Sequence, residues 1–222
     1  PSGLHVNWPN MGIRTRGRFP MSSKRQIEQR KKSLKSLDDM ILSGRAYARL
    51  RKTQSLEAEE YHDEDLRLES LIPYVQRKLP IYVHANEVRQ IEAAVHWANR
   101  HDLQIIIVGG KDAWRTTDLL ITNKVPVIYE NVTNLPSHRY EDYDQAYKGP
   151  ALLHSAGVKF CIASSGSAGA AYKVRNLPNQ AAMAAAYGLP RDVALRSITL
   201  AMTRERSARL PCSVWQARNS VP

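Results

Sequence analysis

From Pro80 onward, short apolar runs alternate with segments of helical periodicity, and this alternation limits the folds open to the chain. Residues 104–108 are Gln-Ile-Ile-Ile-Val, and similar runs occupy 81–84, 125–129 and 158–163. These runs lack the polar alternation of a strand that has one face in water. Continuous apolar strands separated by helices are typical of parallel βα units. The sequence therefore predicts an α/β fold with four such units, either half of a (β/α)8 barrel or a small doubly wound sheet.

The residues before Pro80 show a different pattern. Glycines and prolines interrupt residues 1–20, and apolar positions near a 3.6-residue period predict a helix from Ser22 to about Leu50. A shorter helix is expected at 66–72, behind three acidic residues. No strand is predicted in this region. We divide the chain into a basic, mostly helical segment (1–63), the βα units (64–200) and an irregular tail (201–222).

Size and charge narrow the function classes. The chain has 222 residues, fewer than the about 250 of a complete barrel. It has no apolar run of the roughly 20 residues needed to span a membrane. The net charge is +11, and residues 1–56 hold 13 Lys/Arg against 3 Asp/Glu. Without interleaved aromatics or a known nucleic-acid motif, we interpret this basicity as a solvated helix face and expect only weak nucleic-acid binding. An anion or nucleic-acid binder using residues 14–52 is the alternative.

Chemistry in parallel βα folds lies at the carboxyl ends of the strands. In this chain those ends are His84-Ala85-Asn86, Gly109-Gly110-Lys111, Glu130-Asn131-Val132 and Ser164-Ser165-Gly166. Only the first of them offers an imidazole, a common metal ligand. The two Gly-rich ends could instead present backbone N–H groups to an anion, with Lys111 and Lys173 adding charge. Small residues that turn a corner explain the same pattern.

Three stretches resemble a known family. Residues 79–110, with a Pro-led strand that ends in His84, and residues 124–165 resemble successive units of the amidohydrolase superfamily, in its imidazolonepropionase-like branch. Residues 174–199, with Asn-Leu before an Ala-rich helix and a later Gly-Leu, are similar to its closing stretch. The resemblance covers roughly residues 64–200. It implies the C-terminal half of a (β/α)8 TIM-type barrel.

The resemblance also implies an activity, the hydrolysis of a carbon–nitrogen bond other than a peptide bond in a small-molecule substrate. Water activated by a divalent metal, most often zinc, would attack that bond. The expected ligands on barrel strands five, six and eight are His, His and Asp. His84 matches the first of these, whereas Gly109-Gly110 and Gly166 stand where the other two are expected. We therefore predict an impaired hydrolase without stoichiometric zinc, and no catalytic residue is assigned. A catalytically silent barrel that acts as a binding module is an alternative.

Three residues are candidates for substrate binding. His138 follows the third strand of the βα region, in a loop that could face the site. Arg175 and Asn176 precede the closing Ala-rich helix, where they could hold a substrate carboxylate or cap the helix. A half barrel also leaves one apolar face and two edges of its sheet open. We accordingly expect the isolated chain to self-associate, to aggregate or to be loosely folded.

Overall fold

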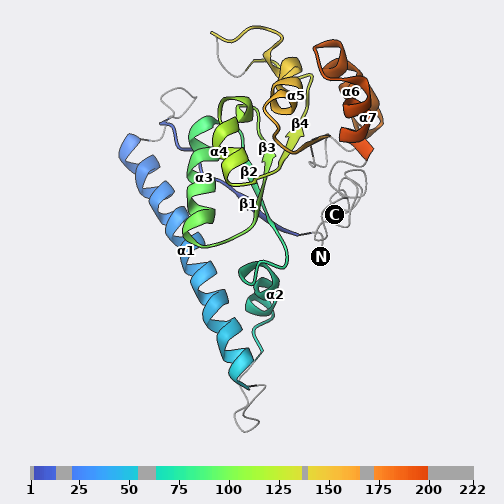
Figure 1. Cartoon of the computed structure of the whole chain (residues 1–222). Coiled ribbons are helices and arrows are strands. Elements are labelled where there is room, and N and C mark those ends of the chain that lie inside the picture. Colours follow the sequence, from blue (N-terminus) through green and yellow to red (C-terminus); the bar gives the residue numbers. More distant parts are fainter. Residues whose placement is uncertain (1–2, 14–21, 55–63, 137–139, 166–172, 200–222) are drawn as a thin grey trace.

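The computed structural model describes residues 3–13, 22–54, 64–136, 140–165 and 173–199. Its centre is a five-stranded parallel sheet in which each strand lies beside the one before it in the chain (Figure 1). The strands are β1 (Leu4–Asn7), β2 (Ile81–Ala85), β3 (Ile105–Gly109), β4 (Val127–Glu130) and β5 (Phe160–Ala163). This sequential order of parallel strands, with helices between them, confirms an α/β fold of the partial-barrel kind.

Helices connect the strands. They are α1 (Ser23–Gln54), α2 (Leu66–Val75), α3 (Val88–Arg100), the 3-10 helix η1 (Ala113–Arg115), α4 (Thr117–Thr122), α5 (Gln145–Ser155), α6 (Leu177–Ala186) and α7 (Arg191–Thr199). The helical segment between β3 and β4 is therefore divided into η1 and α4. The predicted tail, residues 201–222, lies outside the described residues, and the three-part division of the chain stays a prediction.

Strand β1 contradicts the expectation that no strand precedes Pro80. Its residues pair in parallel with β2, and the register places His5 opposite Tyr82 and Asn7 opposite His84. The sequence pattern that would predict this strand was weak, because β1 has only four residues, of which Leu4 and Val6 are apolar. Neighbouring backbone, rather than local sequence preference, defines a strand of this kind.

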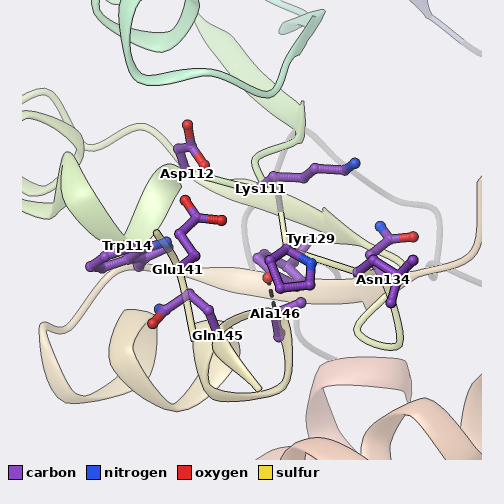
Figure 2. A pocket seen from close by; sticks show the side chains of 10 residues that line it. Lys111, Asp112, Trp114, Tyr129, Asn134, Glu141, Gln145 and Ala146 are labelled. Atoms are coloured by element: carbon purple, nitrogen blue, oxygen red, sulfur yellow. Dashed lines mark hydrogen bonds between the residues drawn. The ribbon is translucent and has the colours of Figure 1, made fainter. Parts of the chain in front are cut away.

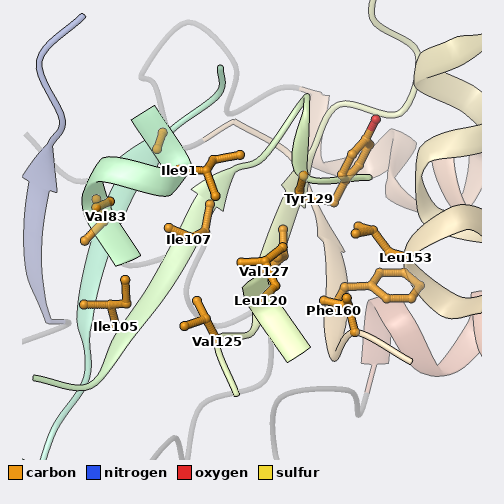
Figure 3. Packing of buried hydrophobic residues seen from close by; sticks show 14 of the residues in the cluster. Val83, Ile91, Ile105, Ile107, Leu120, Val125, Val127, Tyr129, Leu153 and Phe160 are labelled. Atoms are coloured by element: carbon orange, nitrogen blue, oxygen red, sulfur yellow. The ribbon is translucent and has the colours of Figure 1, made fainter. Parts of the chain in front are cut away.

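The two faces of the sheet bury different side chains. Val83, Ile107, Val127, Tyr129 and Ile162 point toward the helices and belong to the main core, part of which Figure 3 shows. The opposite face carries a second cluster formed by Ile106, Val108, Ile128, Cys161 and Ala163. This alternation follows from the two-residue period of a strand.

The second cluster corrects the expectation of an exposed apolar face. Its five side chains are all buried, and Ile128, the most accessible of them, is only 4% exposed. They pack against one another and against Tyr82, which reduces the surface that each presents to water. Among the described residues, β1 pairs only with β2, and β5 pairs only with β4. The sheet therefore keeps two outer edges, and self-association stays a prediction.

Helix α1 is long and lies against the βα units (Figure 1). Ile41 is fully buried in the main core, and Asp38 accepts hydrogen bonds from Trp97 Nε1 (2.9 Å) and His101 Nε2 (2.7 Å) of the neighbouring α3 segment. Basic side chains on its first turns are exposed: Lys24, Arg25, Lys31, Lys32 and Lys35. That exposure fits a solvated helix face. None of the helices in the described ranges is apolar over a stretch long enough to cross a membrane.

Candidate functional site: a histidine pair at the ends of two strands

Two histidines from neighbouring strands meet on the face of the sheet that points away from the helices. Val6, Val83 and Ala85 belong to the helix-side core, so the strand period directs His5 and His84 to the opposite face. His5 Nδ1 lies 3.0 Å from His84 Nε2, which is a direct hydrogen bond between the imidazoles. His84 was predicted from its place at a strand end. His5 was not predicted, because its strand was not recognised.

Neighbouring groups fix this pair in place. The ring of Tyr82 stacks on His5 with centroids 5.0 Å apart and planes inclined by 15°. The N–H of Trp8 donates to the carbonyl of His84 (3.1 Å). Gln90, in the first turn of α3, accepts from the backbone N–H groups of Asn86 (3.0 Å) and Glu87 (3.1 Å). These contacts hold the end of β2 and the segment after β1 together.

Both imidazoles favour the neutral form. Burial lowers the pKa of His5 below its ordinary value of 6.5. Burial also lowers the pKa of His84, and the neighbouring His5 lowers it further. Desolvation disfavours a cationic ring, and two cations this close would repel each other. At neutral pH the pair therefore offers uncharged nitrogens, the form that binds metals.

The end of β3 has no room for a ligand side chain. Gly109 has φ +97°, and a Cβ on it would lie 2.5 Å from Asn86 Oδ1. Gly110 has φ +59°, and its Cβ would lie 2.7 Å from Cγ1 of the buried Val127. L-residues rarely adopt the first conformation, and the second position is sterically blocked. The backbone therefore agrees with the predicted loss of the strand-six histidine.

The alternative of an anion-binding site at Gly109-Gly110 is contradicted for two backbone N–H groups of this loop, because both donate to carbonyl groups of the chain. The N–H of Gly110 donates to the carbonyl of Ala85 (2.9 Å), and the N–H of Asp112 donates to the carbonyl of Asn86 (2.9 Å). These bonds tie the loop after β3 to the end of β2 and leave neither group for an anion. The second predicted anion-binding site, residues 164–169, is described only as far as Ser165.

At the end of β5 the structure shows a packing role. Ser164 is fully buried, and Gln180 of α6 donates to its Oγ at 3.5 Å. Gln180 Oε1 accepts from the N–H of Val132 (3.1 Å) and so links the ends of β4 and β5. Gly166, where the resemblance expects an aspartate, lies outside the described residues.

The histidine pair does not by itself complete a catalytic metal centre. Such zinc sites have three protein ligands and one open position. In the described part of the chain, no group of three or more His, Cys, Asp or Glu side chains could hold a metal ion. A zinc-activated water therefore does not fit the described residues of this chain.

Comparison with known proteins gives a likeness in fold. An amidohydrolase has the same architecture. The crystal structure of the amidohydrolase from Thermotoga maritima MSB8 matches 92% of this chain with a TM-score of 0.68 and 21% sequence identity. The match covers 51% of that protein, so this chain spans about half its length. No family model matches the chain, and no curated protein matches it. At this identity the likeness shows a shared fold.

Two of the predicted substrate-binding residues, Arg175 and Asn176, do not lie beside the histidine pair. Arg175 and Asn176 are exposed and precede α6, which packs beside β5, whereas His84 is on β2, three strands from β5 in the sheet. Asn176 occupies the N-cap position of α6, but its side chain makes no capping hydrogen bond. His138 lies outside the described residues. Substrate binding by these three residues stays a prediction.

A pocket that the sequence did not indicate lies beyond the ends of β3 and β4. It is small and partly open to solvent, and it is lined by Lys111, Asp112, Trp114, Tyr129, Asn134, Leu135, Pro136, Glu141, Gln145 and Ala146 (Figure 2). Burial raises the pKa of Tyr129, and the negative charges of Asp112 and Glu141 raise it further. The Tyr129 hydroxyl donates to the carbonyl of Ala146 (3.0 Å). Because Tyr129 faces the helices, this pocket is on the other side of the sheet from the histidine pair.

Proposed function

We propose that this chain is the second half of an amidohydrolase-type barrel of the imidazolonepropionase-like branch, and that it has lost the ability to hydrolyse a C–N bond by itself. The observation that carries the proposal is the backbone at Gly109-Gly110. The resemblance expects the second ligand at this strand end, where both glycines have positive φ and a Cβ on Gly110 would lie 2.7 Å from Val127 Cγ1. The fold shared with the Thermotoga amidohydrolase supports the ancestry.

The ancestral activity would be the hydrolysis of an amide-like or cyclic C–N bond in a small molecule. A bound divalent metal, zinc above all, supplies activated water in such a centre. In this chain His84 stands at the expected strand end, and its imidazole is held toward His5 rather than toward a second and third ligand. A role in binding fits these residues better than a role in catalysis.

The test combines metal analysis with an activity assay. After exhaustive dialysis, elemental analysis of the purified chain should find far less than one zinc per chain. In the presence of Zn²⁺ or Mn²⁺, the chain should hydrolyse hydantoin and dihydrouracil, two molecules with cyclic C–N bonds, no faster than buffer with the same metal does. Stoichiometric zinc, or hydrolysis that disappears in His84→Ala but not in the exposed-histidine control His96→Ala, would overturn the proposal.

A further inference from the structure

The first half of helix α1 carries a dense group of positive charges on the outside of the fold (Figure 1). Residues 23–36 contain six Lys/Arg and one acidic residue, Glu28, which gives a net charge of +5. Five of the cations are exposed, and we call them the basic face of α1: Lys24, Arg25, Lys31, Lys32 and Lys35. We propose that this basic face binds the phosphates of duplex nucleic acid without reading the base sequence. The proposal does not depend on descent from a C–N hydrolase, because it rests on this helix alone.

The cations of the basic face have no carboxylate partner among the described residues. None of the ion pairs within the described ranges involves any of the five side chains. At the other end of the same helix, by contrast, Arg51 pairs with Glu64 (2.5 Å) and Glu69 (3.1 Å). A cation without such a partner can neutralise a phosphate and release the counterion condensed on it, which is the main source of sequence-independent binding to nucleic acid.

Three lysines of the basic face form a row along the helix. Lys24, Lys31 and Lys35 follow one another at separations of seven and four residues, so their directions around the helix axis lie within about 40° of each other. Lys24 and Lys35 are about 16 Å apart along that axis. A duplex carries one negative charge per roughly 1.7 Å of its length. A row of this length can therefore contact several phosphates at the same time.

The composition of this half of α1 favours a duplex over two other polyanions. A helix that binds a membrane surface buries an apolar face in it, but Leu34, Leu37 and Ile41 pack in the main core, and every exposed residue over 22–36 is polar or charged. Proteins that hold single strands stack the bases on aromatic rings, and residues 23–46 contain no aromatic residue. Phosphate contacts remain, and a duplex offers twice as many of them per unit length as one strand does.

The salt dependence of binding tests the proposal. The purified full chain is titrated into a fluorescein-labelled duplex of random sequence, and fluorescence anisotropy follows binding between about 50 and 200 mM KCl. Five phosphate contacts predict a slope of about −4.5 for the logarithm of the binding constant against that of the salt concentration, a loss of several hundredfold over this range. A slope shallower than about −2 would mean a merely solvated face and would overturn the proposal.

Two variants with the same net charge locate the binding surface. The triple variant Lys31→Gln/Lys32→Gln/Lys35→Gln should make the slope shallower by about 2.7, because three phosphate contacts are lost. The control removes three exposed positive charges outside α1 and should change the slope by less than about 1: Lys78→Gln/Lys124→Gln/Arg191→Gln. Circular dichroism establishes that both variants are folded. Equal changes in the two variants would show that net charge alone drives binding and would refute the basic face.

A membrane surface is the competing partner, and the same variants distinguish it. Sedimentation with phosphatidylserine vesicles at matched salt should recover less of the chain than duplex binding predicts. Stronger binding to the vesicles than to the duplex, with the same dependence on the three lysines of α1, would assign the basic face to a membrane and overturn the proposal.

Discussion

At the scale of single residues, the contact between His5 and His84 joins two neighbouring strands that are far apart in the chain. His84 could be predicted because it follows an apolar strand, and the missing ligand could be predicted because glycine has no side chain to donate. His5 could not, since its role depends on a strand partner 79 residues away in the chain. Such a contact is specified by tertiary structure and leaves no local pattern.

Substitution of Gly110 tests whether a side chain is sterically excluded after β3. Gly110→Ala should lower the free energy of unfolding by about 2–4 kcal/mol, from positive φ and from overlap with Val127. Gly157→Ala is a matched control with φ +82° and no atom near the added Cβ, so it should cost only about 1 kcal/mol. Urea denaturation measures both. Equal losses would show that the space at Gly110 is not restricted.

The histidine pair should also make stability depend on pH. The folded-state pKa of each ring lies below the ordinary value of 6.5. Below pH 6.5 the unfolded chain therefore takes up protons more readily than the folded chain. Stability from this source is complete above pH 6.5 and is lost as the pH falls through the lowered pKa values. Urea denaturation from pH 8 to pH 5 should show this loss, and a His5→Gln/His84→Gln double variant should show less of it than His96→Gln.

At the scale of elements, strands β2 to β5 were predicted to within about two residues because each contains a short run of apolar residues. Helix α1 was predicted from the period of its apolar residues. The division between η1 and α4 was not, because residues 112–122 are apolar or neutral at most positions and contain no glycine or proline to mark a break.

The hydrogen bonds of Asp38 should stabilise the attachment of α1 to the neighbouring α3 segment. It accepts from both Trp97 and His101, and Asp38→Ala would leave these largely buried donors without their acceptor. We expect a loss of about 1–3 kcal/mol in the free energy of unfolding. The adjacent Asp39 is exposed, and Asp39→Ala should change it by less than about 0.5 kcal/mol. Thermal denaturation of the two variants compares them directly, and a similar effect of both would show that the contacts carry no net stability.

At the scale of the whole molecule, the five parallel strands of the described ranges form a sheet in which β1 and β5 are the outer strands. The number of βα units left half a barrel and a small doubly wound sheet open, and the family resemblance predicted the half barrel. The sequence did not predict the burial of the second cluster, because a pattern of apolar residues shows which side chains avoid water and not which atoms cover them.

The open edges predict self-association. β1 and β5 each have one strand partner within the described ranges, and unpaired backbone groups at an edge can pair with another chain. Size-exclusion chromatography with light scattering should show dimers or larger species at micromolar concentration. A monodisperse monomer with a cooperative melt above about 60 °C, high for a domain of ordinary stability, would contradict this prediction.

The position of β1 also has a kinetic consequence. Leu4 of β1 pairs with Ile81 of β2, so this pairing closes a far longer loop than any other neighbouring pair in the sheet. Closing a longer loop costs more chain entropy, and contacts between distant residues form slowly. β1 should therefore dock after β2 to β5 have assembled. In hydrogen-exchange experiments its amides should open at lower free energy than those of β3, and the histidine pair would exist only once this last strand is in place.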